Sequence, residues 1–347
     1  MKSIADRLIQ TGRLEAFEYR SLIYGYDDQT LAYLQENAVR TAVEQFGHSI
    51  YVRGLIEISS CCRNNCLYCG LRRDNIHASR YRLTDSQILE CCRKGYAAGL
   101  RTFVLQGGED PAFDEKRLTG LTKDIKAEFP DVALTLSLGE MSTDVYMSLR
   151  QAGADRYLLR HEAADRSLYE RLHPLEMSWS NRRRCIADLK ELGYQTGMGM
   201  MVGAPGQTAD SLVEDLLFMQ EINPEMIGIG PFIPHKDTPL GTHPSGTLQQ
   251  TLLLIAIVRL MFPKALIPST TALATLSSDG RKAGILSGAN VVMPNLSPCD
   301  VRGKYEIYEG KASTGCEAYE GLRALEEETA GFGYKIDYSR GDYNYEV

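Results

Sequence analysis

Three cysteines in one short segment are the residues of this 347-residue chain best suited to metal chemistry. Cys62, Cys66 and Cys69 give the spacing C-x3-C-x2-C, with an aromatic residue, Tyr68, directly before the third cysteine. A 4Fe-4S cluster takes one thiolate per iron, so three cysteines leave the fourth iron open to a small molecule. A structural zinc site or a purely redox-active cluster generally needs a fourth protein ligand. No such ligand stands at a typical spacing, since the nearest histidine, His77, lies well beyond Cys69.

The other cysteines are interpreted as packing residues or neighbours of the ligands. Cys61 stands beside Cys62, but its spacing to the next cysteine is one residue too long. Cys91, Cys92 and Cys185 fall inside expected helices, where a free cysteine packs as a small apolar residue. Nine cysteines without an export signal indicate a reducing compartment, so we expect a cytoplasmic protein.

The overall composition indicates a folded, water-soluble enzyme-sized chain. Hydrophobic residues make up 44% and charged residues 24%, which argues against disorder and against membrane burial. A net charge of −7 gives no general attraction for nucleic acid. The chain has no stretch resembling a signal peptide or a membrane span. We therefore expect neither a nucleic-acid partner nor a membrane partner.

Apolar, β-rich segments alternate with amphipathic helical segments along most of the chain. Eight strands with intervening helices predict an α/β fold, a (β/α)8 TIM-type barrel, better than they predict a doubly wound sheet. We expect an N-terminal helical extension at 1–48, the barrel at 49–310 and a short C-terminal extension at 311–347. The expected strands are 51–59, 102–106, 133–138, 156–159, 196–202, 226–232, 266–270 and 289–293. The expected helices are 84–98, 115–129, 142–152, 180–192, 209–222 and 246–261, with one more at 317–329 in the tail.

Residues that follow the strands are the next candidates, because such barrels carry their chemistry at the C-terminal strand ends. Gly107 and Gly108 follow the second strand and let the backbone approach a ligand, and Glu109 can accept hydrogen bonds from an ammonium group. Arg160 and Glu162 follow the fourth strand and suit a carboxylate and other polar groups. Taken alone, Gly-Gly-Glu is common in turns, and the Arg and Glu equally fit a salt bridge that closes the barrel end.

The cysteine spacing and the Gly-Gly-Glu segment together resemble the radical S-adenosylmethionine (SAM) superfamily. In that superfamily the amino and carboxylate groups of SAM bind the open iron of the cluster. The resemblance implies one 4Fe-4S cluster on Cys62, Cys66 and Cys69, and reductive cleavage of SAM to a 5′-deoxyadenosyl radical. The residues it implies as SAM contacts are Tyr68, Gly107, Gly108, Glu109, Ser137, Arg160, Glu162, Arg182 and Met201.

A run of segments from about residue 50 to residue 310 resembles one family within that superfamily, the HydE maturases of FeFe-hydrogenase. The broader biotin synthase-like group shares the barrel, and a methylornithine synthase-like amino-acid mutase is the alternative. A non-enzymatic iron-sulfur scaffold is a further alternative. The segments are CRNNCLYCGLRRDN at 62–75, RYRLT at 80–84, VLQGGEDP at 104–111, TLSLGE at 135–140, AGADRYLLRHE at 152–162, MVGAPGQT at 201–208, IGIGPFIPHKDTPL at 227–240, IPSTTALATL at 267–276 and GANVVMPN at 288–295.

The HydE resemblance implies a role in maturation of the hydrogenase active-site cluster (the H-cluster). The implied substrate is a small anionic, sulfur-containing compound, or a cysteine bound to iron. The residues expected to bind it are Arg160, Thr270, Thr271 and Tyr305, which offer a guanidinium and hydroxyls. The implied partners are an electron donor such as flavodoxin or ferredoxin, and other hydrogenase maturases.

The C-terminal extension departs from the pattern of that family. Many members hold a second, auxiliary cluster on three cysteines near the C-terminus. Here Cys316 stands alone, Tyr319 occupies a position where another thiol would be wanted, and Cys299 is too isolated to complete a motif. We therefore expect one cluster and no second one.

Overall fold

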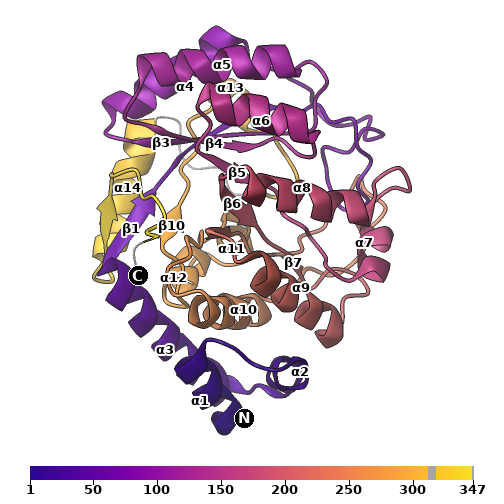
Figure 1. Ribbon diagram of the computed structural model, residues 1–347, viewed down its shortest axis with the longest axis vertical. Coiled ribbons are helices and arrows are strands. Elements are labelled where there is room, and N and C mark those ends of the chain that lie inside the picture. Colours follow the sequence, from indigo (N-terminus) through magenta and orange to yellow (C-terminus); the bar gives the residue numbers. More distant parts are fainter. Residues whose placement is uncertain (312–317, 346–347) are drawn as a thin grey trace.

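Six parallel strands form one continuous sheet in this protein. The computed structural model describes residues 1–311 and 318–345. All six residues of the sheet's first strand are buried, as expected for a parallel strand covered on both faces. Each strand pairs with the next in parallel register, and the sheet curves through the middle of the molecule (Figure 1). In spatial order the strands are β2 (Gly54–Ser59), β3 (Thr102–Gly107), β4 (Ala133–Ser137), β5 (Arg156–Leu158), β6 (Gln195–Met198) and β8 (Met226–Ile227).

Isolated parallel bridges close this sheet into a barrel. Met226 bridges to Leu266, Pro268 bridges to Val291, and Asn295 bridges to Leu55 on the first strand. The ring therefore passes through eight segments in the predicted order, which confirms the barrel. The expected strand at 266–270 is wrong as a regular strand, because Pro268 has no N–H to donate to a ladder.

Three other expected strands are broken into shorter pieces. The first divides into β1 (Ser49–Val52) and β2, the fifth into β6 and β7 (Met201–Val202), and the sixth into β8 and β9 (Gly230–Pro231). A close backbone approach accompanies the last two breaks. A Cβ on Gly199 would lie 1.9 Å from the carbonyl oxygen of Gly228, so the two strands touch where both lack side chains. The eighth expected strand retains only β10 (Val291–Val292).

Helices surround the sheet, and the predicted ones all form. Thr84 and Gln87 make the expected capping box, with each side chain bonded to the other residue's backbone N–H. No helix within the described part of the chain is long and apolar enough to cross a membrane. The ring helices are α4 (Asp85–Ala97), α5 (Glu115–Glu128), α6 (Thr143–Ala152), α8 (Trp179–Glu191), α9 (Ala209–Ile222) and α10 (Leu248–Met261). Four short helices of the described chain were not predicted from the sequence, namely α7 (Arg166–Leu172), α11 (Thr271–Leu276), α12 (Gly280–Ile285) and α13 (Cys299–Arg302).

Three N-terminal helices cover the outside of α10 and α9. They are α1 (Lys2–Thr11), α2 (Ala16–Gly25) and α3 (Asp28–Phe46), and they lie at the lower edge of the molecule in Figure 1. α10 is buried along nearly its whole length because it packs on the barrel on one side and on α3 on the other. This explains why its sequence is apolar all round instead of amphipathic.

The C-terminal extension is attached to the N-terminal end of the barrel. Its strand β11 (Lys335–Asp337) pairs in parallel with β1. Beyond β11, the fully buried guanidinium of Arg156 donates to the carboxylate of Asp342 at 2.6 Å and to the carbonyl oxygen of Arg340 at 2.8 Å. The tail thus supplies the negative charge that pairs with Arg156, a buried cation at the N-terminal end of the barrel. The helix α14 (Ala318–Ala330) contacts β11 and lies at the left of the molecule in Figure 1.

The contact between the tail and the barrel floor predicts a pH-dependent contribution to stability. Partial burial opposes ionisation of Asp342, but its hydrogen bonds and the charges of Arg340 and Arg156 win and lower its pKa to about 2. A depressed pKa stabilises the folded state above the ordinary pKa of an aspartate and loses that effect as the pH falls. Asp342→Asn should lower the free energy of unfolding by about 1–2 kcal/mol at pH 7, since the carboxylate is partly exposed. Denaturant titrations should show this difference shrinking as the pH falls below about 4. A control is Asp337→Asn, because that carboxylate bonds to Ser339 within its own turn.

Candidate active site

A cavity of about 330 Å³ lies at the C-terminal ends of the barrel strands. Its walls come from segments that are far apart in the sequence but share this end of the sheet, as expected for a parallel barrel. Of the residues predicted from the sequence, all but one line this cavity. These are Cys62, Cys66, Tyr68, Cys69, Gly107, Gly108, Glu109, Ser137, Arg160, Glu162, Arg182, Met201, Thr270 and Thr271.

The cysteine loop is held in shape by a guanidinium that the sequence analysis did not single out. Arg80 donates four hydrogen bonds of 2.6–3.2 Å to backbone carbonyl oxygens on both sides of the loop, those of Ser60, Leu71, Arg72 and Asn75. Burial removes these carbonyl oxygens from water, and the hydrogen bonds from Arg80 replace those that water would make. The arrangement fixes where the loop leaves β2 and where it turns back.

The three cysteine thiols face one cavity, and each is disfavoured as a bare thiolate. Burial raises the pKa of Cys62 and raises that of Cys69 to about 12. Burial also raises the pKa of Cys66, and the nearby Cys69 and Cys62 add to the effect. A cationic metal centre that binds the thiolates would stabilise their charged form and so lower these pKa values. The thiols share a wall of the cavity, so they fit a cluster that takes each thiolate on a different iron.

A single metal ion fits this part of the chain less well. In the described ranges, 1–311 and 318–345, no three His, Cys, Asp or Glu side chains form a group that could hold one ion.

The backbone next to the cysteines leaves no space for a side chain at position 108. A Cβ on Gly108 would lie 2.3 Å from the carbonyl oxygen of Cys61 and 2.8 Å from the Cβ of Cys62. The second glycine of the Gly-Gly-Glu segment is therefore required by the approach of the cysteine loop.

Glu109 reaches from β3 across to the loop after β4. One carboxylate oxygen accepts from the backbone N–H of Glu140 at 2.9 Å, and the other accepts from the Nε of Arg63 at 3.1 Å. Gly139 makes this reach possible, because a Cβ there would lie 2.0 Å from the Cγ of Glu109. The φ angle of Gly139 is +83°, which also favours glycine. The carboxylate is thus held at the cavity wall by two neighbouring loops.

Arg160 and Glu162 form the ion pair that the sequence analysis left open as an alternative. The Nη2 of Arg160 lies 3.0 Å from a carboxylate oxygen of Glu162 and donates to the carbonyl oxygen of Met200 at 2.6 Å. Its buried Nε has no hydrogen-bond partner among the described residues. Glu162 has a φ of +64°, an uncommon conformation for a residue with a side chain. Strain of this kind is often kept at functional sites.

Arg182 fixes the backbone of that segment. It donates to the carboxylate of Glu140 at 2.6 Å and to the carbonyl oxygen of Arg160 at 2.6 Å, and its side chain is almost fully buried. With its charge paired in this way, Arg182 connects the loop after β4 with the loop after β5. Because Arg182 also holds the side chain of Glu140, it helps to position the backbone N–H of Glu140 that donates to Glu109.

Tyr68 is fixed by a histidine that the sequence analysis missed. Its hydroxyl lies 3.3 Å from the Nε2 of His173, and the Nδ1 of His173 lies 2.9 Å from the carbonyl oxygen of Tyr169. Burial and, to a smaller extent, the charge of Arg182 lower the pKa of His173 to about 3. A neutral ring with its proton on Nδ1 accepts at Nε2, so the Tyr68 hydroxyl donates to it.

Thr270 and Thr271 line another part of the cavity, at the start of α11. The buried Oγ1 of Thr270 has no hydrogen-bond partner in the described chain and makes no cap on the helix. An unpaired buried hydroxyl is costly unless a ligand or water bonds to it. Tyr305 does not line the cavity, because it is buried behind the wall and its hydroxyl bonds to Gln106. Tyr308, three residues later, lines the cavity instead.

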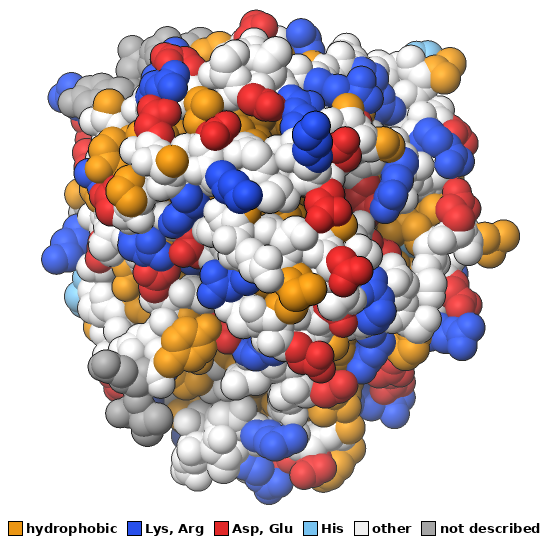
Figure 2. Space-filling model, turned by 45° about the horizontal axis from the view of Figure 1, so that its top comes forward, with side chains coloured by type: hydrophobic (Ala, Val, Ile, Leu, Met, Phe, Trp, Pro, Cys, Tyr) orange, Lys and Arg blue, Asp and Glu red, His pale blue; other side chains and the backbone are white. Residues whose placement is uncertain are grey.

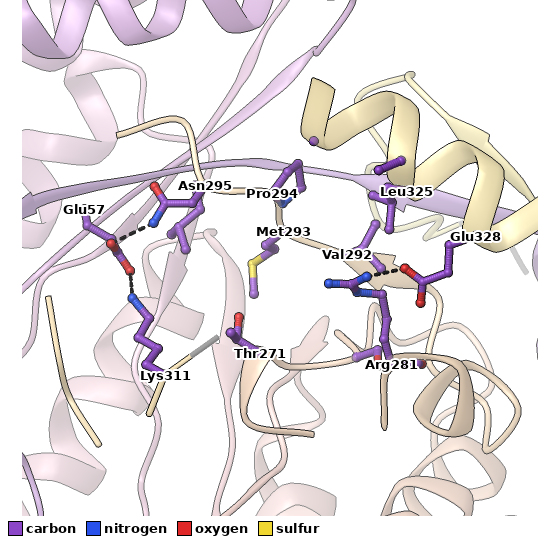
Figure 3. Close-up of a pocket in the computed structure, with 14 residues that line it drawn as sticks. Glu57, Thr271, Arg281, Val292, Met293, Pro294, Asn295, Lys311, Leu325 and Glu328 are labelled. Carbon is purple, nitrogen blue, oxygen red and sulfur yellow. Dashed lines mark hydrogen bonds and ion pairs between the residues drawn. The ribbon is translucent and has the colours of Figure 1, made fainter. Parts of the chain in front are cut away.

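A buried carboxylate and an amine complete this wall, and the sequence analysis assigned neither. Glu57 pairs with the ammonium of Lys311 and accepts from the Nδ2 of Asn295 at 2.8 Å (Figure 3). Both charged groups also line a second chamber of about 260 Å³, which continues past Met293 to the ion pair between Arg281 and Glu328 (Figure 3). An acidic residue inside the otherwise apolar strand GLIEIS was the available signal.

The expectation of a single cluster concerns residues that are only partly described. Cys316 lies in 312–317, outside the described residues. Cys299 is exposed at the start of α13. The absence of a second cluster therefore stays a prediction.

Comparison with known proteins identifies the family. Residues 56–219 match the model of the radical SAM superfamily. The chain is 49% identical over 265 residues to the [FeFe] hydrogenase maturase subunit HydE of Thermotoga maritima, which covers 76% of this chain and 75% of that protein. It is 30% identical over 297 residues to 3-methylornithine synthase of Methanosarcina acetivorans, covering 85% of this chain and 83% of that one.

Solved structures agree with these matches. A crystal structure of methylornithine synthase (PylB) has a TM-score of 0.83 and 26% identity, and covers 96% of this chain and 97% of that one. A structure of HydG, a maturase of the [FeFe]-hydrogenase, has a TM-score of 0.81 at 20% identity, which shows the fold alone; it covers 97% of this chain and 77% of that one. The barrel, the three cysteines at its mouth and the 49% identity together place this enzyme in the radical SAM superfamily and, within it, in the HydE family.

Proposed function

We propose that this enzyme cleaves SAM reductively and uses the resulting radical in maturation of the FeFe-hydrogenase active-site cluster. The observation that carries the proposal is the convergence of the three cysteines with Glu109, Arg160 and Thr270 on one cavity. When bound, the 4Fe-4S cluster supplies an open iron and the electron for SAM cleavage. The protein's part is to hold the reactants in line and to keep water away from them.

SAM would lie between the cysteine loop and the ends of β3 to β6. Glu109 suits the ammonium group of SAM, because it lines the cavity and each of its oxygens can accept a second hydrogen bond beside the one from Glu140 or Arg63. The unpaired Nε of Arg160 suits a carboxylate or a ribose oxygen. Gly107, Ser137 and Met201 also line the cavity and would contact the nucleoside.

The substrate would lie on the far side of SAM, against the start of α11. We propose a small anionic compound that contains sulfur, the substrate class that the resemblance to the HydE family implies. Thr270 offers a free hydroxyl there, and Lys311 offers a cation paired with Glu57. A substrate carboxylate could share the ammonium of Lys311 with Glu57. Tyr305, placed behind the wall, would act through Lys311, whose ammonium lies 4.8 Å from its ring.

A carbon-skeleton mutase acting on an amino acid is the second candidate. The 30% identity and the TM-score of 0.83 to methylornithine synthases favour it. The higher identity to HydE favours the maturase. An amino acid and a sulfur compound derived from cysteine both carry a carboxylate, so only the reaction separates them.

The remaining partners follow from the chemistry. SAM cleavage needs a one-electron donor, and flavodoxin or ferredoxin would supply it in the cytoplasm. Other hydrogenase maturases are expected to receive the product. Basic and acidic side chains are interspersed over the face shown in Figure 2, which supports the expectation that nucleic acid is not a partner.

The ligand assignment predicts which cysteines are essential. Anaerobically reconstituted protein should hold about four irons per chain. Cys62→Ala, Cys66→Ala and Cys69→Ala should each abolish formation of 5′-deoxyadenosine. Cys61→Ala is the matched control and should keep both iron and activity. Iron analysis and chromatography of the products measure the two effects. A cluster lost in Cys61→Ala but kept in Cys62→Ala would overturn the assignment.

The SAM contacts predict a loss of binding without a loss of iron. Glu109→Ala and Arg160→Ala should each weaken SAM binding about tenfold to hundredfold, because each removes a charge-assisted hydrogen bond. Arg183→Ala is the control, since Arg183 pairs with Glu221 outside the cavity. Equilibrium dialysis with labelled SAM gives the affinities. Wild-type affinity in both cavity variants would refute this SAM position.

The free hydroxyl of Thr270 predicts a selective effect on the substrate. Thr270→Val keeps the shape of the side chain and should weaken binding of a thiazolidine analogue of cysteine roughly threefold to tenfold. The affinity for SAM should not change. Thr135→Val is the control, because its hydroxyl is also buried without a partner but does not line the cavity. Isomerisation of lysine or another amino acid, with cysteine-derived compounds ignored, would favour the mutase instead.

A further inference from the structure

The outer side of the cysteine loop faces solvent through two neighbouring loops. Their contacts with the cysteine segment are direct. The N–H of Arg73 donates to the carbonyl oxygen of Asn64 at 2.8 Å, and the Nδ2 of Asn65 donates to Asp74 at 2.6 Å. These bonds fold the loop at 71–79 back onto the segment between the first two cysteines.

The loop at 173–178 covers the same segment from the other side. The Sγ of Cys66 lies 3.7 Å from the Sδ of Met177, and the N–H of Leu67 donates to the carbonyl oxygen of Leu172 at 2.9 Å. An ion pair of 3.6 Å between Arg73 and Glu176 joins this loop to the loop at 71–79. The two loops therefore form one outer rim around the cysteines.

Each loop of this rim carries an apolar side chain almost wholly in water. Leu175 is 100% exposed and Ile76 is 88% exposed, the two highest values among the large hydrophobic residues of the described chain. Single exposed apolar residues are ordinary, but two of this degree on adjoining loops form a feature typical of a contact surface. Nothing in the local structure uses either side chain for packing.

A polar recess adjoins the rim directly behind the third cysteine. It has a volume of about 330 Å³, and its floor includes Gly70 and Leu71, which follow Cys69. His77, Lys236, Lys304 and Glu306 lie around it. A Cβ on Gly70 would lie 2.1 Å from the carbonyl oxygen of Glu306, so the chain after Cys69 packs closely against the far wall of this recess. The recess therefore borders the cysteine loop, but the backbone directly after Cys69 is buried there.

We infer that this rim, with Ile76 and Leu175 as its apolar contacts, is the docking surface for a small electron-carrier protein. The inference rests on the proposed function, which requires one electron for each SAM cleaved. The carrier loses that electron and the cluster gains it, with no bond made or broken in the transfer. The inner side of the cysteine loop is taken by the cavity, so the outer rim is the side from which a carrier can approach the cysteines.

The charges of the rim indicate how the carrier is held. Arg73 is paired with both Asp74 and Glu176, and Lys236 lies 3.6 Å from Glu309. The two rim loops carry two cations, Arg72 and Arg73, and two carboxylates, Asp74 and Glu176, so the rim has little net attraction over long distances. The apolar pair would then supply most of the contact, as the central residues of small interfaces do. A brief, low-affinity complex of this kind suits electron transfer.

The test compares two ways of reducing the same enzyme. The variants are Ile76→Ser and Leu175→Ser, with Tyr24→Ser on α2 as the control because Tyr24 is 87% exposed but lies on the N-terminal helices. The carrier is whichever of reduced flavodoxin and reduced ferredoxin drives faster 5′-deoxyadenosine formation by the wild type. With that carrier, each rim variant should be about tenfold slower at subsaturating carrier. With dithionite, all four proteins should be equally active.

A binding measurement that needs no turnover accompanies it. Amide hydrogen exchange of the wild type with excess oxidised carrier should slow at 71–79 and 173–178, and this protection should be lost in the rim variants. Wild-type rates of the rim variants with the carrier, protection elsewhere, or no carrier-driven activity in the wild type would each overturn the docking surface. Equal losses with dithionite would also overturn it, since the residues would then act on the site itself. Failure of the wild type even with dithionite would instead refute the proposed SAM cleavage.

Discussion

The hydrogen bonds from Arg80 to the backbone of the cysteine loop are the constraint on which the rest of the site depends. One guanidinium pairs carbonyl groups at residues 60, 71, 72 and 75, so it closes the loop that carries all three cysteines. Arginine suits this task because its planar group donates in several directions and stays charged when partly buried. With the loop fixed, the cysteines face the cavity while their backbone faces the outer rim.

Glycines allow the other cavity walls to approach the cysteine loop closely. Gly108 meets the carbonyl oxygen of Cys61, and Gly139 makes room for the side chain of Glu109. A chain of charged hydrogen bonds then runs from Glu109 through the backbone of Glu140 to Arg182 and on to the carbonyl of Arg160. Each strand end is therefore positioned by its neighbour, which is how a barrel assembled from distant segments holds a small ligand in one orientation.

The sequence was sufficient to predict the barrel and most of the cavity, because both depend on local signals. Of the fourteen predicted residues that line the cavity, cysteine spacing and strand-end position marked eight, and the family resemblance implied the other six. It could not separate Tyr305 from Tyr308, since which of two nearby tyrosines turns inward depends on packing. Glu57 with Lys311, and Arg80 with its carbonyls, were missed because their partners are far along the chain or are backbone atoms. The strand expected at 266–270 was wrong because the prediction gave more weight to the apolar residues of this segment than to Pro268, which has no N–H to donate.

The central claim is that three cysteines leave one iron open and that SAM occupies it. Electron-nuclear double resonance of the reduced, reconstituted enzyme with SAM labelled with 15N at its amino group tests this most directly. A hyperfine coupling from that nitrogen to the cluster spin should be present in the wild type and in Cys61→Ala. A reduced cluster whose spectrum shows no coupling to the labelled nitrogen at saturating SAM would contradict it.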